Sequence, residues 1–166
     1  QVLTGCACQY PKQGLQAARK AYEETGDLSL VHGMLQAQFE GFLRDSLELP
    51  EEYVELVVGR GWGLAGILDG GRILATKIPK SGYLLDYLQE PDPERRRQYY
   101  CHCPRVRDIL KTGGSLPITY CYCGAGFYRD IWEEIVQAPV EVQVLKSVLA
   151  GDDVCTIAVR LPVASR

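Results

Sequence analysis

Residues 115–161 read SLPITYCYCGAGFYRDIWEEIVQAPVEVQVLKSVLAGDDVCTIAVRL. Patterns typical of strands at 115–122 and 140–149 lie on either side of a predicted amphipathic helix at 126–136. A Gly-Asp-Asp turn then leads into a third predicted strand at 154–161. The stretch predicts a strand, a helix and a hairpin. We therefore expect an α+β fold, sandwich-like in its layers, with a mostly antiparallel sheet and packed helices.

The N-terminal part of the chain predicts helices. Apolar residues recur at helical spacing over residues 13–25 and 30–47, and Pro50 opens a third helix. We expect an N-terminal helical subdomain at 1–58 and an α/β domain at 59–166, packed together as one compact unit.

Four glycines within residues 59–66 resemble a phosphate-binding loop at first sight. No Gly-Lys-Ser/Thr follows them, and they do not form a G-x-G-x-x-G that opens a clear helix. A close-packed turn into a hairpin, with strands at 64–68 and 72–78, is therefore the favoured interpretation over a nucleotide loop. A short helix is expected at 82–89.

Most of the reactive side chains lie in one Cys-His-Cys and one Cys-x-Cys sequence, which contribute Cys101, His102, Cys103, Cys121 and Cys123. Four sulfur or nitrogen ligands satisfy tetrahedral zinc, so this segment predicts a zinc site. The one-residue spacing is tighter than is usual for zinc, and buried cysteines without a metal are the alternative. Cys6 and Cys8 would extend the set toward an iron–sulfur cluster, which is the less favoured cofactor.

The same residues also support a catalytic hypothesis. Cys123 lies near the start of the predicted helix, where the helix dipole favours a thiolate that could attack an electrophile. His102 is the candidate general base, because His32 lies in an apolar helical context that favours a structural role. Arg105 and Arg107 could bind a carboxylate, although a solvated helix face is the ordinary interpretation of such a basic segment.

Aromatic residues around the cysteines suggest a third hypothesis, a sensor that binds a small molecule without catalysis. Tyr100 and Tyr122 are the candidates for ligand contact, and a packed core is the alternative for the whole set. The set comprises Tyr99, Tyr100, Tyr120, Tyr122, Phe127, Tyr128 and Trp132.

Whole-chain properties narrow the class of protein. The 166 residues are 46% hydrophobic and 23% charged, as in an ordinary globular domain, and the net charge of -3 argues against nucleic acid as a partner. No apolar run approaches the roughly 18 residues of a membrane span. The cysteines number seven and occur mostly in close pairs, so we expect cytoplasmic thiols, reduced or metal-bound, rather than a disulfide framework.

The segment 121–162 resembles a known family. It has Cys-x-Cys-Gly-x-Gly before a helix and Leu-x-Gly-Asp-Asp-x-Cys before a final strand. Both are similar to the C-terminal part of the 4-vinyl-reductase-like domain and of the related proteins grouped with L-2-amino-thiazoline-4-carboxylic acid hydrolase. The resemblance implies an α/β sensor-like domain that binds a small molecule, often forms a homodimer, and in several cases holds zinc through cysteines.

The resemblance also assigns positions. Cys121 or Cys123, together with Cys155, match family cysteine positions. Many of these domains have a further cysteine four residues before the turn glycine, where this chain has Ser147. A zinc site here would therefore need ligands from the Cys-His-Cys sequence at 101–103.

Overall fold

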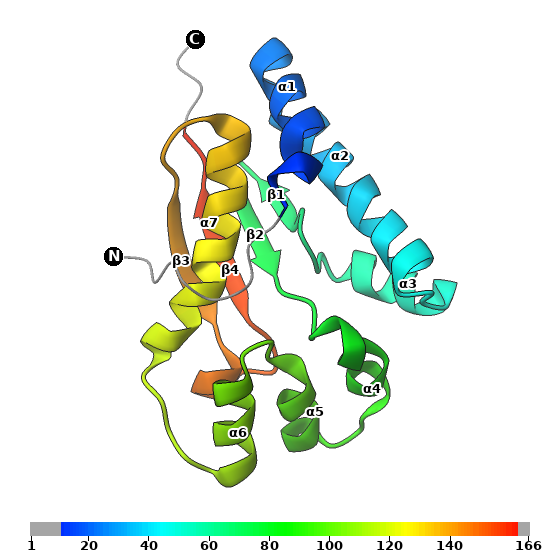
Figure 1. Cartoon of the computed structure of the whole chain (residues 1–166), viewed down its shortest axis with the longest axis vertical. Coiled ribbons are helices and arrows are strands. Elements are labelled where there is room, and N and C mark those ends of the chain that lie inside the picture. The colour runs from blue at the N-terminus through cyan, green and yellow to red at the C-terminus, as the bar shows by residue number, and fades with distance from the viewer. Residues whose placement is uncertain (1–10, 163–166) are drawn as a thin grey trace.

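The computed structural model describes residues 11–162, and a four-stranded antiparallel sheet lies at its centre (Figure 1). The strands are β1 (Ile67–Asp69), β2 (Arg72–Thr76), β3 (Glu141–Lys146) and β4 (Thr156–Arg160), in the order β1-β2-β4-β3. In the central register, Val159 of β4 lies between Ile73 of β2 and Val142 of β3. The α+β class is confirmed.

Helix α7 (Tyr122–Val136) covers one face of the sheet and packs against β3 and β4 (Figure 1). Helix α1 (Gln16–Thr25) packs against both α7 and α2 (Leu28–Gly41). The shared core of these elements includes Leu15, Val31, Leu35, Ile73, Ile131, Trp132, Ile157 and Val159. It therefore joins the predicted helical subdomain to the predicted α/β domain.

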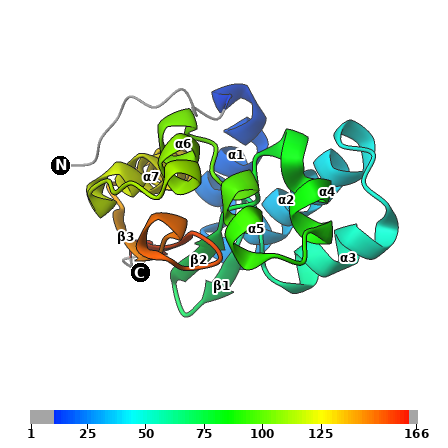
Figure 2. The ribbon, with the colours of Figure 1, turned by 90° about the horizontal axis from the view of Figure 1, so that it is seen from below.

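Four shorter helices, α3 (Glu51–Gly59), α4 (Leu84–Gln89), α5 (Pro93–Tyr100) and α6 (Pro104–Thr112), complete the fold (Figure 2). Helix α5 packs against both α4 and α6. A second core includes Phe39, Leu43, Val54, Val57, Trp62, Leu84, Tyr87 and Tyr100. The basic segment at 92–111 thus consists mainly of two helices, each with proline as its first residue.

The prediction of a strand at 115–122 is wrong. A 3₁₀ turn, Ile118–Cys121, leads directly into α7, which begins four residues earlier than predicted. Pro117 has no N–H for a sheet ladder, and its carbonyl accepts a hydrogen bond from the Tyr120 N–H at 3.0 Å instead. Ile118 and Tyr120 are exposed, so the pattern that resembled a strand has no core to face.

Several other elements are confirmed with altered limits. The helix predicted at 30–47 ends as α2 at Gly41 and continues as a π turn, Phe42–Ser46. The strand predicted at 140–149 stops at Lys146, and a 3₁₀ turn, Val148–Ala150, follows it. No helix among the described residues is long and apolar enough to cross a membrane.

The glycine-rich segment forms the predicted turn. Gly63 has a φ of +107°, and a Cβ there would lie 2.3 Å from the Phe39 ring. A Cβ on Gly66 would lie 2.6 Å from the Leu74 carbonyl oxygen. The His32 Nε2–H donates to the Gly66 carbonyl at 2.8 Å, which confirms a structural role for this imidazole. The glycines let helix, turn and sheet approach closely.

Candidate functional site

One cavity of about 220 Å³ gathers the reactive side chains of the C-terminal half of the chain. All five cysteines in the described part of the chain lie on its wall, together with His102. We call it the thiol cavity, and its lining is Lys77, Cys101, His102, Cys103, Val106, Tyr120, Cys121, Cys123, Gly124, Phe127, Val144, Cys155 and Ile157.

Three chain segments bring these cysteines together. Cys101 follows α5 and Cys103 is the N-cap of α6, and both have extended backbone dihedrals. Both thiols line the thiol cavity, and so does His102 between them. Cys121 and Cys123 lie at the start of α7, and Cys155 directly precedes β4. The Cys-His-Cys loop between two helices thus faces the first turn of a third.

His102 is half-buried and anchored to the backbone. Its Nε2 lies 3.1 Å from the Ile78 carbonyl oxygen, which can only accept, so Nε2 carries the proton and Nδ1 the lone pair. Burial lowers the pKa of this imidazole to about 4, and the positive charge of Lys77 acts in the same direction. His102 is therefore neutral at pH 7, the form that binds metals or accepts a proton.

Lys77 brings a positive charge to the same cavity. The backbone of Lys77 is fixed by two hydrogen bonds. Its backbone N–H donates to the Cys155 carbonyl at 3.0 Å, and its backbone carbonyl accepts from the Tyr100 hydroxyl at 2.5 Å. The Tyr100 oxygen in turn accepts from the Cys155 N–H at 2.9 Å. A Cβ on Gly124 would lie 3.3 Å from Lys77 Nζ, so the ammonium lies over the first turn of α7.

Burial governs the protonation of two thiols. It raises the pKa of Cys101, and it raises that of Cys155 to about 11, whereas Lys77 lowers both by a smaller amount. The Cys155 Sγ also accepts weakly from the Val148 N–H at 3.5 Å. These two thiols are protonated at neutral pH until a metal or another reaction partner removes the proton.

Ser147 contacts the cysteine cluster directly. Its hydroxyl is fully buried, lies 2.9 Å from the Cys121 sulfur and accepts from the Leu149 N–H at 3.1 Å. The Ser147 backbone N–H donates to the Asp152 carboxylate at 2.8 Å. Ser147 therefore faces Cys121 from the turn that follows β3.

A second cavity, of about 330 Å³, adjoins the thiol cavity and shares Lys77, His102 and Phe127 with it. Its wall is largely apolar and comes from α2, the π turn after it, the glycine turn and α7. We call it the apolar cavity, and its lining is Gln38, Phe39, Phe42, Gly63, Leu64, Lys77, Ile78, His102, Phe127 and Tyr128.

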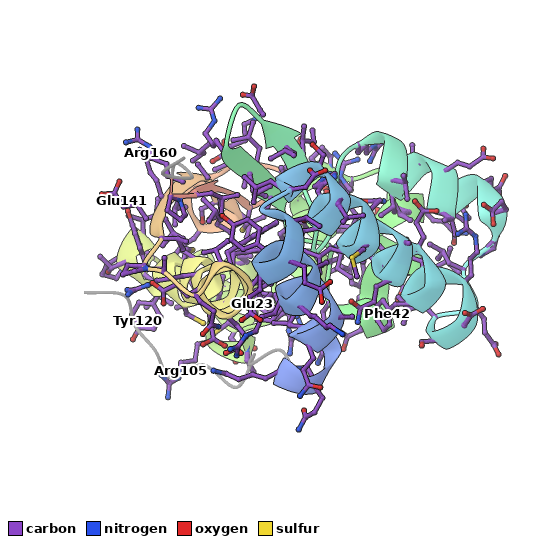
Figure 3. All side chains as sticks on the ribbon, turned by 90° about the horizontal axis from the view of Figure 1, so that it is seen from above. Glu23, Phe42, Arg105, Tyr120, Glu141 and Arg160 are labelled. Carbon is purple, nitrogen blue, oxygen red and sulfur yellow. The ribbon has the colours of Figure 1, made fainter. Side chains whose placement is uncertain are left out.

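The four predicted ligand-binding residues lie outside both linings. Tyr100 is buried in the second core, and Tyr122 is half-buried against the first. Arg107 donates to the Cys101 carbonyl at 3.1 Å and lies over the Tyr83 ring. Arg105 is exposed and projects outward, well separated from the side of α2 where Phe42 lies (Figure 3).

Sequence reasoning missed Lys77 and the wall from α2. Lys77 is a single basic residue after a strand, and Phe39 and Phe42 look like ordinary core positions of an amphipathic helix. Phe127 and Tyr128 are the members of the predicted aromatic set that do line the apolar cavity, whereas Trp132 is fully buried in the core. No local pattern marks Lys77 as a site residue.

Zinc fits the chemistry of the thiol cavity, since thiolates and a neutral imidazole with a carbonyl-anchored N–H are its usual ligands. Within residues 11–162, however, no group of three or more His, Cys, Asp or Glu side chains is arranged to hold a metal ion. Binding would therefore require the thiols to draw closer together. Cys6 and Cys8 lie outside the described residues.

Comparison with known proteins gives one result of limited extent. A model described as "Family of unknown function (DUF6144)" matches residues 93–164. No curated protein and no solved structure matches the chain. The matched segment runs from α5 through β4 and contains His102 and all five described cysteines, whereas Lys77, Phe39 and Phe42 lie outside it. The chain is thus similar to this family over the part that supplies the thiol cavity.

Proposed function

We propose that this chain is a small-molecule-binding protein in which the thiol cavity binds zinc and the apolar cavity receives the ligand. The observation that carries the proposal is the junction of the two cavities. Thiols from three chain segments line one chamber, and this chamber shares Lys77, His102 and Phe127 with a larger apolar chamber. Small-molecule sites usually combine apolar walls with a few convergent polar groups.

The residues that would hold zinc are Cys101, Cys103, Cys121 and Cys123, with His102 Nδ1 as a substitute ligand. A bound zinc ion would hold these thiols as thiolates and tie the loop between α5 and α6 to the start of α7. The resemblance to vinyl-reductase-like domains, several of which hold zinc, supports this assignment. A reducing cytoplasm suits such a thiol-rich site.

The test is elemental analysis of protein purified without added metal, with thiol titration before and after denaturation. We expect about one zinc per chain and about four thiols that react only after chelation, as for a tetrahedral site. Cys103→Ser should lose the metal, whereas Cys155→Ala, in the same cavity but outside the ligand set, should keep it. Metal-free protein with freely reactive thiols would refute the zinc assignment.

A cysteine-dependent hydrolase is the second candidate, because Cys123 and His102 line the same cavity. Cys123 would add to the electrophilic carbon of a small C–N ring or amide substrate while the neutral His102 accepts the thiol proton. The C–N bond would then break as His102 returns the proton to the leaving nitrogen, and water would hydrolyse the sulfur-bound intermediate to free the thiol. The test is hydrolysis of L-2-amino-thiazoline-4-carboxylate by the wild-type protein and by Cys123→Ala, with Cys155→Ala as the matched control. Equal turnover by wild type and Cys123→Ala would eliminate this candidate.

A further inference from the structure

We infer that the ligand is an amphiphilic carboxylate, with an apolar, preferably aryl, body in the apolar cavity and its carboxylate beside Lys77. The inference rests on the proposed function and specifies the chemical class of the small molecule. It follows from three features: the wall of the apolar cavity, the charges around Lys77 and the position of Lys77 between the two chambers.

The wall determines the body of the ligand. Phe39, Phe42 and Phe127 contribute rings from two sides of the apolar cavity, and Leu64 and Ile78 add aliphatic surface. Tyr128 packs edge-on to Phe127, with ring centroids 5.4 Å apart. The Tyr128 hydroxyl donates to the Gly63 carbonyl at 3.4 Å, so this polar group already has a partner within the protein. Aromatic walls favour a planar ring through edge and offset contacts.

The volume limits the size of the ligand. At about 330 Å³, the apolar cavity is at the small end of the range for organic ligands. At the packing density of protein interiors, this space takes a body of roughly ten to fifteen non-hydrogen atoms. A single ring with a short chain fits this limit, whereas a nucleotide or a long acyl chain exceeds it.

Lys77 determines the head group. Lys77 lines both cavities, yet no Asp or Glu of the described residues lies on either wall, and within residues 11–162 the Lys77 ammonium forms no ion pair. A lysine in a cavity without a carboxylate is a ready partner for an anionic ligand.

Helix α7 strengthens this preference. The lack of a side chain at Gly124 lets the Lys77 ammonium lie over the first turn of the helix. The N-terminal end of a helix carries a partial positive charge, which by itself disfavours a nearby cation. A carboxylate beside the ammonium would offset this like-charge contact. Because Lys77 is shared by the two chambers, the head group would lie at their junction, beside the thiols.

The experiment compares two probes that differ only in charge, 4-phenylbutyrate and 4-phenylbutyramide, by isothermal titration calorimetry. We expect the wild-type protein to bind the acid at least about tenfold more tightly than the amide, as a charge-assisted contact predicts. Lys77→Met keeps the apolar stem but loses the charge, and should bind both probes with the affinity that the wild type shows for the amide. Lys77→Arg should restore most of the preference.

A second pair of variants tests the apolar wall. Phe42 is 39% exposed at the rim, so Phe42→Ala should fold normally and lose several-fold in affinity for both probes equally. Leu56→Ala removes a similarly exposed side chain, 37%, away from both linings and should change neither affinity. Failure of both probes to bind at millimolar concentration would overturn the inference. So would equal binding of acid and amide by the wild type.

The same samples separate this inference from the proposed function. Zinc content is measured on each of them before titration. Zinc-loaded protein that does not prefer the acid would overturn the ligand class and leave the metal assignment standing. Metal-free protein that still prefers the acid in a Lys77-dependent manner would refute the zinc assignment and support the ligand class.

Discussion

The thiol cavity and the apolar cavity are neighbours, but the chain builds them in different ways. The cysteines of the thiol cavity come from two short motifs and from the position just before β4, all within residues 101–155. The wall of the second combines α2, the glycine turn, the segment after β2 and α7, which are far apart in sequence. Reactive groups are thus encoded locally in this protein, whereas the space for a ligand exists only after folding.

The largest expected effect on stability comes from a residue of the apolar cavity and should leave the thiol cavity unchanged. Phe39 is 5% exposed, and its ring fills the space beside Gly63 on the apolar wall. Phe39→Ala should lower the free energy of unfolding by about 3–4 kcal/mol through lost burial and an enlarged cavity. The number of reactive thiols in the native protein should not change. Urea unfolding and thiol titration measure the two quantities, and a changed thiol count would mean that the cavities are not independent.

The next largest effect should come from Tyr100, which lies outside both linings but binds the backbone of two lining residues. Its hydroxyl donates to the Lys77 carbonyl and accepts from the Cys155 N–H. Tyr100→Phe leaves these buried groups without that partner and should cost about 2 kcal/mol in unfolding free energy. Tyr53→Phe removes a hydroxyl that accepts an exposed hydrogen bond from Gln89, and serves as the control. Equal losses in the two variants would contradict this role of Tyr100.

A pH effect should come from His102, which lies on the wall that the two cavities share. Burial lowers the pKa of His102 from 6.5 to about 4, so between these values the unfolded chain binds more protons than the folded one. The stability contributed by neutral His102 is therefore complete above pH 6.5 and is lost as the pH falls toward 4, by on the order of 1–2 kcal/mol. His102→Asn should abolish this part of the pH dependence of unfolding, and His32→Asn should retain it. An unchanged slope in His102→Asn would exclude this imidazole as its source.

The smallest expected change in stability sharpens the metal assignment. Ser147→Cys places another sulfur beside Cys121, in a fully buried position, and should change the unfolding free energy by less than about 1.5 kcal/mol. If zinc binds through the four cysteines proposed above, its coordination is already complete, so the added sulfur should change zinc affinity by less than about threefold, as measured by competition with a chelator. Ser147→Ala is the matched control without sulfur. A tenfold gain in the cysteine variant alone would mean that the four proposed cysteines do not complete the zinc site.

The site could be predicted only in part, because some of its residues form a recognisable sequence motif and others do not. The Cys-His-Cys and Cys-x-Cys sequences stand out by residue type, and a cavity does contain them all. Arg105 and Arg107 carried the predicted anion-binding role, but the charge on the cavity wall belongs to Lys77. Charge density along the chain says nothing about which face a helix presents, and that face is decided by packing.

The α+β class, the helices of the N-terminal block, the glycine turn and the structural role of His32 follow from the sequence by itself, because hydrophobic period and turn chemistry act over a few residues. The carbonyl anchor of His102 and the contact of Ser147 with Cys121 were decided by the tertiary structure. So was the position of Lys77 between two cavities. Each of these depends on groups far apart in the chain, whose approach is set by the packing of α2, α7 and the sheet around two cores.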